Sequence, residues 1–148
     1  MLKTLKRLFG DSAAAAVHDD DRHLHLAVAT LLHESKRVDF GEDEAEHEAA
    51  LAAMRALFGL DAAVADPLLA EGREKARQLE SYFGPVGVVK RAFSLEQRAQ
   101  LVEHLWRIAY ADGRLDRDED HFVRKISHLL HVSNTDCMLA RSRARARH

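Results

Sequence analysis

Residues 105–119 read LWRIAYADGRLDRDE, and this stretch decides the fold class of the chain. The apolar side chains of its first part fall on one side of a helix, namely Leu105, Trp106, Ile108 and Ala109. Asp112 to Asp116 forms a turn, and Asp116 followed three residues later by Glu119 is typical of a helix start. The stretch therefore predicts two helices joined by a short acidic turn.

The same acidic turn occurs earlier in the chain. A shift of 73 residues (112 minus 39) places Asp39, Asp43 and Glu46 on Asp112, Asp116 and Glu119 with identical spacing. Apolar positions coincide as well: Val28 and Leu32 fall on Leu101 and Leu105, and Ala50, Ala53 and Leu57 fall on Val123, Ile126 and Leu130. This pattern predicts a duplicated helix–turn–helix over about residues 24–70 and 97–140, with the two copies paired through their apolar faces.

The rest of the chain also favours helix. It is rich in Ala and Leu, has only two prolines, and shows no β pattern. We expect one helix over residues 24–38 and a second that follows the first acidic turn and ends at Gly59. A third helix should begin near Pro67, which suits the first turn of a helix. Residues 82–93, with two glycines and a proline, predict an irregular connection with one short helix. The fold class is therefore all-α.

Two further helix starts can be read from capping residues. Ser94 with Gln97 three residues later predicts a capping box at the start of the helix that carries Trp106. Ser133 with Asp136 predicts the start of a final helix. Both patterns lie in the second copy of the repeat.

The two ends of the chain differ from this helical domain of residues 24–140. In residues 1–23, Leu2, Leu5, Leu8 and Phe9 predict a short amphipathic helix, and residues 11–22 an acidic connection. That helix packs on its own domain in the favoured interpretation and makes peripheral contact with a membrane in the alternative one. Residues 141–148, with alternating arginines, suit the basic C-terminal end of the final helix, followed by a solvated tail.

Composition narrows the function classes. The net charge of −2 argues against a dedicated nucleic-acid-binding domain. The single cysteine excludes an internal disulfide and fits a reducing compartment. No run of about 18 apolar residues occurs, and Lys3, Lys6 and Arg7 interrupt the N-terminal segment too closely for a signal peptide. We therefore expect a cytoplasmic protein.

Capping explains two acids of each turn, and the third suggests a cation. Asp116 and Glu119 suit the start of a helix, where backbone N–H groups are unpaired. Asp112 instead follows the C-terminal end of the preceding helix, where a carboxylate is unfavourable unless a cation is bound. Oxygen ligands of this kind suit Ca²⁺ or Mg²⁺, and the turn reads like the second half of an EF-hand loop. Capping alone and cation binding both remain open.

The stretch from Leu105 to Glu119, together with Leu129 to Ser133, resembles the TerB-like (tellurite resistance protein B) family. The resemblance covers nearly the whole chain and implies an all-α bundle of about seven helices with pseudo-twofold repeats. It also implies divalent-cation binding by acidic residues, a role in tellurite resistance and stress response, and association with other proteins. The candidate metal ligands are Asp112, Asp116 and Glu119, followed by Asp39, Asp43 and Glu46. The first turn departs from the pattern because Phe40 stands where glycine follows Asp112 in the second.

Other groupings carry weaker signals. Glu44 with His47 and Asp118 with His121 have the spacing found in di-iron bundles, with Glu34 and Glu103 as the other nearby carboxylates. They are one residue out of step with the repeat, and surface or capping roles are favoured. Cys137 lacks a specified base, so burial is favoured over catalysis. Trp106 and Tyr110 are expected in the core.

Three hypotheses follow. The leading one is a non-catalytic, cation-binding accessory module that acts through partner proteins. The alternative is a metal-free helical interaction module in which the acids only cap helices. The third and least favoured is a di-iron or other metal-dependent enzyme.

Overall fold

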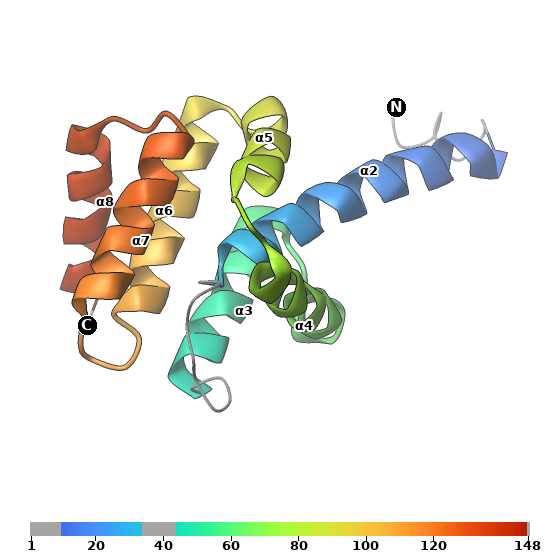
Figure 1. Ribbon diagram of the computed structural model, residues 1–148. Helices are drawn as coiled ribbons and strands as arrows, with labels where there is room; N and C mark the ends of the chain where they lie inside the picture. The colour runs from blue at the N-terminus through green and yellow to red at the C-terminus, as the bar shows by residue number, and fades with distance from the viewer. Residues whose placement is uncertain (1–9, 34–43, 148) are drawn as a thin grey trace.

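The computed structural model describes residues 10–33 and 44–147, and of residues 10–19 the helical backbone alone. Helices make up this part of the chain, and no strand occurs in it, which confirms the all-α prediction. Figure 1 shows their order: α2 (Gly10–Leu31), α3 (Glu44–Phe58), α4 (Ala62–Gln78), α5 (Phe83–Ala92), α6 (Leu95–Ala109), α7 (Arg117–Leu129) and α8 (Asn134–Ala146). No helix among these residues is long and apolar enough to cross a bilayer.

Helix α6 connects the two halves of the molecule. It packs against α7 and α8 on one side, where the three helices lie side by side, and against α3 on the other (Figure 1). In the N-terminal half, α4 and α5 each pack against α2. Trp106 is completely buried, and its indole Nε1–H donates a hydrogen bond to the Cys137 carbonyl at 3.1 Å. This bond joins α6 to α8 inside the core.

Most of the predicted helix ends are confirmed. Ser94 Oγ accepts the Gln97 N–H at 3.2 Å, and Gln97 Oε1 accepts the Ser94 N–H at 2.8 Å, which completes the capping box. Ser133 Oγ accepts the Asp136 N–H at the start of α8. Gly59 ends α3 with a φ of 70°, a conformation that costs glycine little.

The acidic connection expected over residues 11–22 is wrong, because α2 begins at Gly10 and continues to Leu31. The run from Ala13 to Ala16 has the highest helix propensity, and no proline or glycine follows Gly10 before the end of the helix. Figure 1 shows the first part of α2 extending away from the rest of the molecule. The amphipathic segment of residues 1–9 lies outside the described residues, as do residues 34–38 of the predicted first helix.

The basic end expected for the final helix is confirmed, but the tail does not begin at residue 141, because α8 continues to Ala146. Ala140 and Ala144 are fully buried, so small side chains alternate with arginines and let α8 pack closely on α6. The Arg141 guanidinium lies 5.5 Å from the centroid of the Trp106 ring, and its Nε donates to the Tyr110 hydroxyl at 2.9 Å. These contacts hold the basic segment against the core.

Two smaller expectations change. Helix α4 begins at Ala62 with Asp61 as its cap, so Pro67 lies inside the helix rather than in its first turn. Residues 83–92 form one regular helix, with Pro85 in the first turn, where a missing N–H has no consequence.

The duplication stays a prediction, because the turn of its first copy, residues 34–43, lies outside the described residues.

Helices α2 and α4 cross in very close contact at Gly72. A Cβ at this position would lie 2.6 Å from the Ala29 carbonyl carbon and 2.8 Å from Ala29 Cβ, and real contacts of that kind require the backbone to shift. Gly84 offers a comparison, since a Cβ there meets nothing within 4 Å.

We therefore expect Gly72→Ala to lower the free energy of unfolding by about 1–3 kcal/mol, as overpacking does in other cores. Gly84→Ala, the matched control, should leave stability unchanged or raise it slightly. Urea denaturation of both variants measures the difference. Equal stability of the two would contradict the close crossing of α2 and α4.

Candidate functional site

The second acidic turn begins where α6 ends. The Tyr110 N–H donates to the Trp106 carbonyl at 2.9 Å, and the Gly113 N–H then donates to the Tyr110 carbonyl at 2.9 Å. Gly113 adopts a φ of 84°, which residues with a Cβ rarely occupy. The chain thereby reverses direction within a few residues and enters α7 at Arg117.

Asp112 has a structural role that the sequence analysis did not foresee. Its Oδ1 accepts the backbone N–H of Arg114 at 3.0 Å, and the side chain is exposed. Aspartate commonly bonds the N–H two residues ahead in this way and so stabilises a turn. The position of Asp112 after a helix C-terminus therefore has an explanation that requires no cation.

The other two acids of this turn point in different directions. Asp116 Oδ1 accepts the Glu119 N–H at 2.8 Å, which confirms Asp116 as the cap of α7. Asp116 is exposed, whereas the Glu119 residue is only 6% exposed. Glu119 borders a small cavity of about 30 Å³ whose other walls are apolar, among them Leu105 and Phe122.

These three acids do not form a ready-made metal site. Among the described residues, no three His, Cys, Asp or Glu side chains lie close enough to share one ion. Ca²⁺ takes six to eight oxygen ligands, so a cation here would have to draw both aspartates and several carbonyls or waters together. In the first turn, Glu46 is buried like Glu119, while Asp39 and Asp43 lie outside the described residues.

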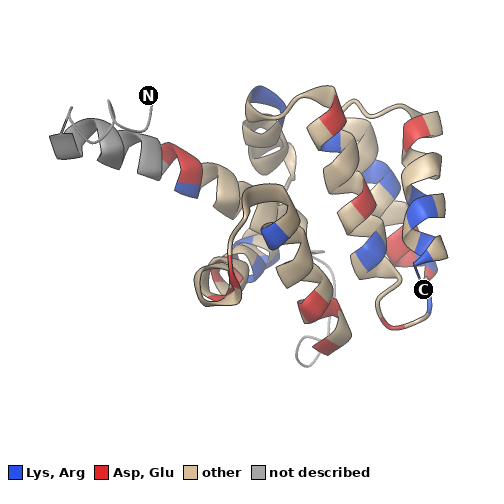
Figure 2. Cartoon of the chain, turned by 180° about the vertical axis from the view of Figure 1, so that it is seen from behind, with Lys and Arg blue, Asp and Glu red and all other residues tan. Residues whose placement is uncertain are grey.

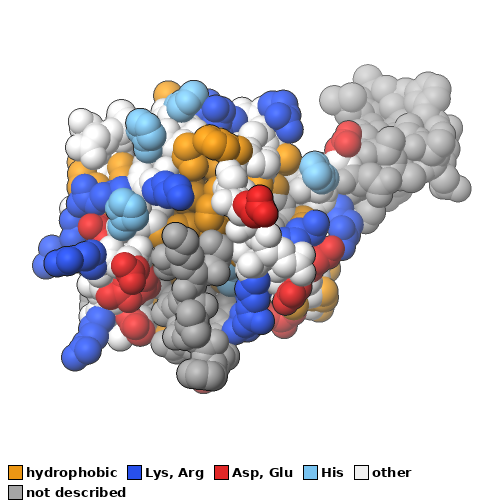
Figure 3. Space-filling view, viewed as in Figure 1, with side chains coloured by type: hydrophobic (Ala, Val, Ile, Leu, Met, Phe, Trp, Pro, Cys, Tyr) orange, Lys and Arg blue, Asp and Glu red, His pale blue; other side chains and the backbone are white. Residues whose placement is uncertain are grey.

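The surrounding charge also affects this turn. Acidic residues occur where α6 meets α7, and basic residues of α8 lie beside them (Figure 2). Figure 3 shows acidic and basic side chains next to one another on the surface. The proximity of Asp120 contributes to the raised pKa of Arg141, after the hydrogen bond with Tyr110. Basic groups beside the turn reduce the attraction of the acids for a cation.

The residues considered for a di-iron centre have other contacts. His47 Nε2 lies 2.8 Å from Asp66 Oδ1, so it links α3 to α4. The Glu103 carboxylate binds Arg107 and, at 2.5 Å, Arg143 Nε. Glu44, Asp118 and His121 are exposed, and Glu34 lies outside the described residues. In the part of the chain that the structure describes, these groups do not gather around one point.

The remaining expectations about single side chains are confirmed. Cys137 is buried with a free thiol, and Trp106 and Tyr110 belong to the core. The Tyr110 hydroxyl accepts the hydrogen bond from Arg141.

His104 is a buried group that the sequence analysis missed. The residue is 7% exposed on α6, and Nδ1 accepts no hydrogen bond from the residues that the structure describes. Burial, followed by the charge of Arg107, lowers the pKa of His104 to about 4. The sequence could have predicted this burial, because His104 follows Leu101 by three positions and so lies on the apolar side of the helix.

The low pKa makes the fold sensitive to acid. In the folded protein His104 stays neutral down to about pH 4, whereas in the unfolded chain it binds a proton near pH 6.5. Protonation therefore favours the unfolded chain, and stability falls as the pH decreases from 6.5 to 4, by about 3 kcal/mol for this group alone. Urea denaturation across this range should show a smaller loss for His104→Leu than for His121→Leu, an exposed control. Equal losses would contradict the burial of a neutral His104.

A family model described as Tellurite resistance protein TerB matches residues 25–142, which run from the second half of α2 into α8. No curated protein and no solved structure gives a significant match.

Proposed function

Because the chain belongs to the TerB family of tellurite resistance proteins, we propose that it is a non-catalytic accessory module that acts through partner proteins in tellurite resistance or a related stress response. The family match covers most of the chain, so the proposal concerns the helical bundle as a whole. The proposed site of action is the cytoplasm, which agrees with a single, buried thiol.

The acidic turn from Asp112 to Glu119 is the proposed site of a divalent cation, Ca²⁺ or Mg²⁺. The observation that supports it is the exposed Asp112 carboxylate, whose Oδ2 makes no bond to any residue that the structure describes. The carbonyls at the end of α6 supply further oxygen atoms nearby. Asp39, Asp43 and Glu46 are the second proposed ligand set. Because binding requires the turn to rearrange, the affinity should be low.

Calorimetric titration of chelator-stripped protein with Ca²⁺ and then Mg²⁺ tests this site. Asp112→Asn removes a charge but keeps an oxygen that can accept the Arg114 N–H, so the turn should survive. We expect this variant to lose cation binding and the accompanying rise in melting temperature. Asp118→Asn removes the same charge from an exposed position on α7 and should bind as the parent protein does. Addition of Asp39→Asn extends the test to the first turn. Absence of binding in the parent protein would reject the cation site.

The second candidate function is a metal-free interaction module, in which the acids serve only the backbone. The observations that favour it are the two hydrogen bonds from carboxylates to N–H groups, Asp112 to Arg114 and Asp116 to Glu119. Under this proposal the helical bundle binds its partner proteins without a bound ion.

Variants of Asp116 separate the two candidates. Asp116→Ala removes the helix cap and should lower the free energy of unfolding by about 1 kcal/mol in either case. Asp116→Asn retains an equivalent cap and should keep full stability in chelator. If a cation binds here, Asp116→Asn should lose the stabilisation by Ca²⁺ that the parent protein shows in thermal unfolding. If both proteins respond to Ca²⁺ alike, Asp116 is not a ligand.

A further inference from the structure

A groove of about 490 Å³ opens between α2, α4 and α5, away from the acidic turn. Its walls are mainly apolar and include Leu26 and Ala27 of α2, Leu79 after α4, and Pro85 and Val88 of α5. Small-molecule sites commonly have volumes of about 300–1,000 Å³ and apolar walls with a few polar groups. The groove therefore has the size and lining of a ligand site.

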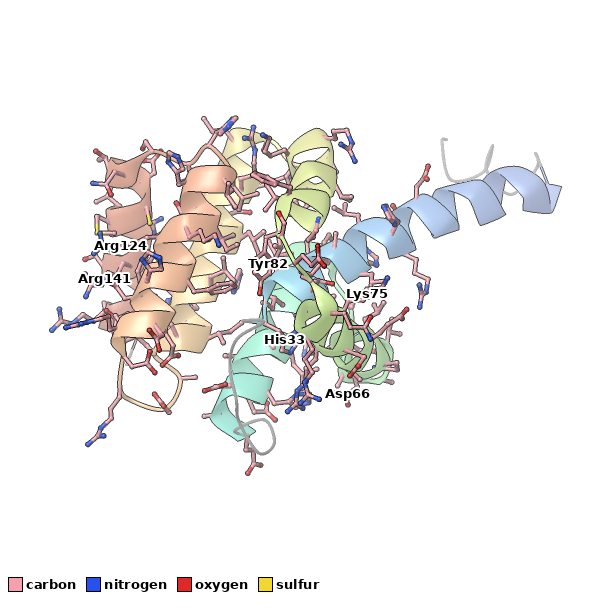
Figure 4. All side chains as sticks on the ribbon, viewed as in Figure 1. His33, Asp66, Lys75, Tyr82, Arg124 and Arg141 are labelled. Atoms are coloured by element: carbon pink, nitrogen blue, oxygen red, sulfur yellow. The ribbon has the colours of Figure 1, made fainter. Side chains whose placement is uncertain are left out.

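Two of the four polar side chains that line the groove have hydrogen-bond partners. The Thr30 hydroxyl donates to the Leu26 carbonyl at 2.8 Å, within its own helix. Gln78 Nε2 donates to Glu74 Oε1 at 3.3 Å. Lys75 is exposed, and its side chain makes no ion pair or hydrogen bond with any residue that the structure describes. Figure 4 shows Lys75 beside the crossing of α2 and α4. His23 is the other group here that can carry a positive charge.

We infer that this groove binds a single-chain carboxylate amphiphile, with the alkyl chain along the apolar walls and the carboxylate at the Lys75 ammonium. The charge of the groove selects this occupant. The protein's own residues 2–9 also carry apolar side chains, but Lys3, Lys6 and Arg7 repeat the positive charge of Lys75. An external carboxylate complements both the walls and the charge.

Gly84 offers a position at which a side chain can be added beside the groove. It lines the groove, and a Cβ built on it meets no atom within 4 Å. Gly84→Leu should therefore place a side chain in open space next to the site and exclude the alkyl chain. Ala92→Leu adds the same apolar side chain to an exposed position of α5 that does not line the groove. Retention of the parent melting temperature shows that each variant is folded.

Calorimetric titration with decanoate, decanol and decyltrimethylammonium, below the concentrations at which they form micelles, tests the inference. These probes share one alkyl chain and differ in the charge of the head group. We expect decanoate to bind most tightly and Gly84→Leu to abolish its binding, while Ala92→Leu binds as the parent does. Lys75→Gln should weaken decanoate binding by about threefold to fivefold, as expected for an exposed ion pair, and leave decanol unchanged. Arg77→Gln, on the same helix outside the groove, should have no effect.

Three results would overturn the proposal. The first is no binding of decanoate to the parent protein. The second is unchanged binding to folded Gly84→Leu, which would place the alkyl chain elsewhere. The third is equal affinity for all three probes with no effect of Lys75→Gln, which would remove the carboxylate from the site. Because no residue of the groove belongs to the acidic turn, each outcome is independent of cation binding.

Discussion

The burial of α6 on two sides is the constraint on which the rest of the structure depends. Its buried side chains include Leu101, Leu105 and Trp106, and no single neighbouring helix can cover them all. Helix α3 covers one side, and α7 and α8 cover the other. The hydrogen bond from Trp106 to the Cys137 carbonyl fixes the position of α8, since a buried indole N–H without a partner is costly. The acidic turn follows directly from this arrangement, because it begins at the end of α6 that the core holds in place.

Within the turn, the same carboxylates have two competing uses. Asp112 and Asp116 each bond a backbone N–H, and such bonds contribute about 0.5–1.5 kcal/mol to stability. A cation gains its ligands only by sharing or replacing those bonds, while the basic residues of α8 oppose its approach. Ion binding at this turn is therefore coupled to the local stability of the start of α7. A rearrangement there need not reach the core, because α6 and α8 are held together through Trp106.

The sequence is informative where local rules and burial agree. Asp116, Ser94 and Ser133 begin helices as predicted, because each side chain can bond an N–H three residues away whatever the rest of the chain does. The predictions are wrong where charged residues suggested an exposed segment although helix propensity or core packing favoured a helix. The acidic residues of 11–22 suggested a connection, but this alanine-rich segment is helical. The arginines after residue 140 suggested a solvated tail, but Ala144 packs in the core. The Asp112 bond to Arg114 depends on the path of the turn, and the groove depends on the crossing of three helices, so neither is visible in a local pattern.

The two proposed sites lie in different halves of the molecule, and Tyr82 lies between these halves. Its ring contacts Phe122 of α7 edge-on, with 5.4 Å between the ring centroids, and its hydroxyl donates to the His33 carbonyl at 3.1 Å. Tyr82 also immediately precedes α5, which forms one wall of the groove, while Phe122 borders the cavity beside Glu119. A shift of α5 would therefore displace α7 through the packed rings of Tyr82 and Phe122, because closely packed contacts transmit displacement. Such coupling would require two alternative positions of α5, whereas tight packing around a buried Tyr82 favours a single one. The groove and the turn are therefore best regarded as independent sites on one rigid bundle.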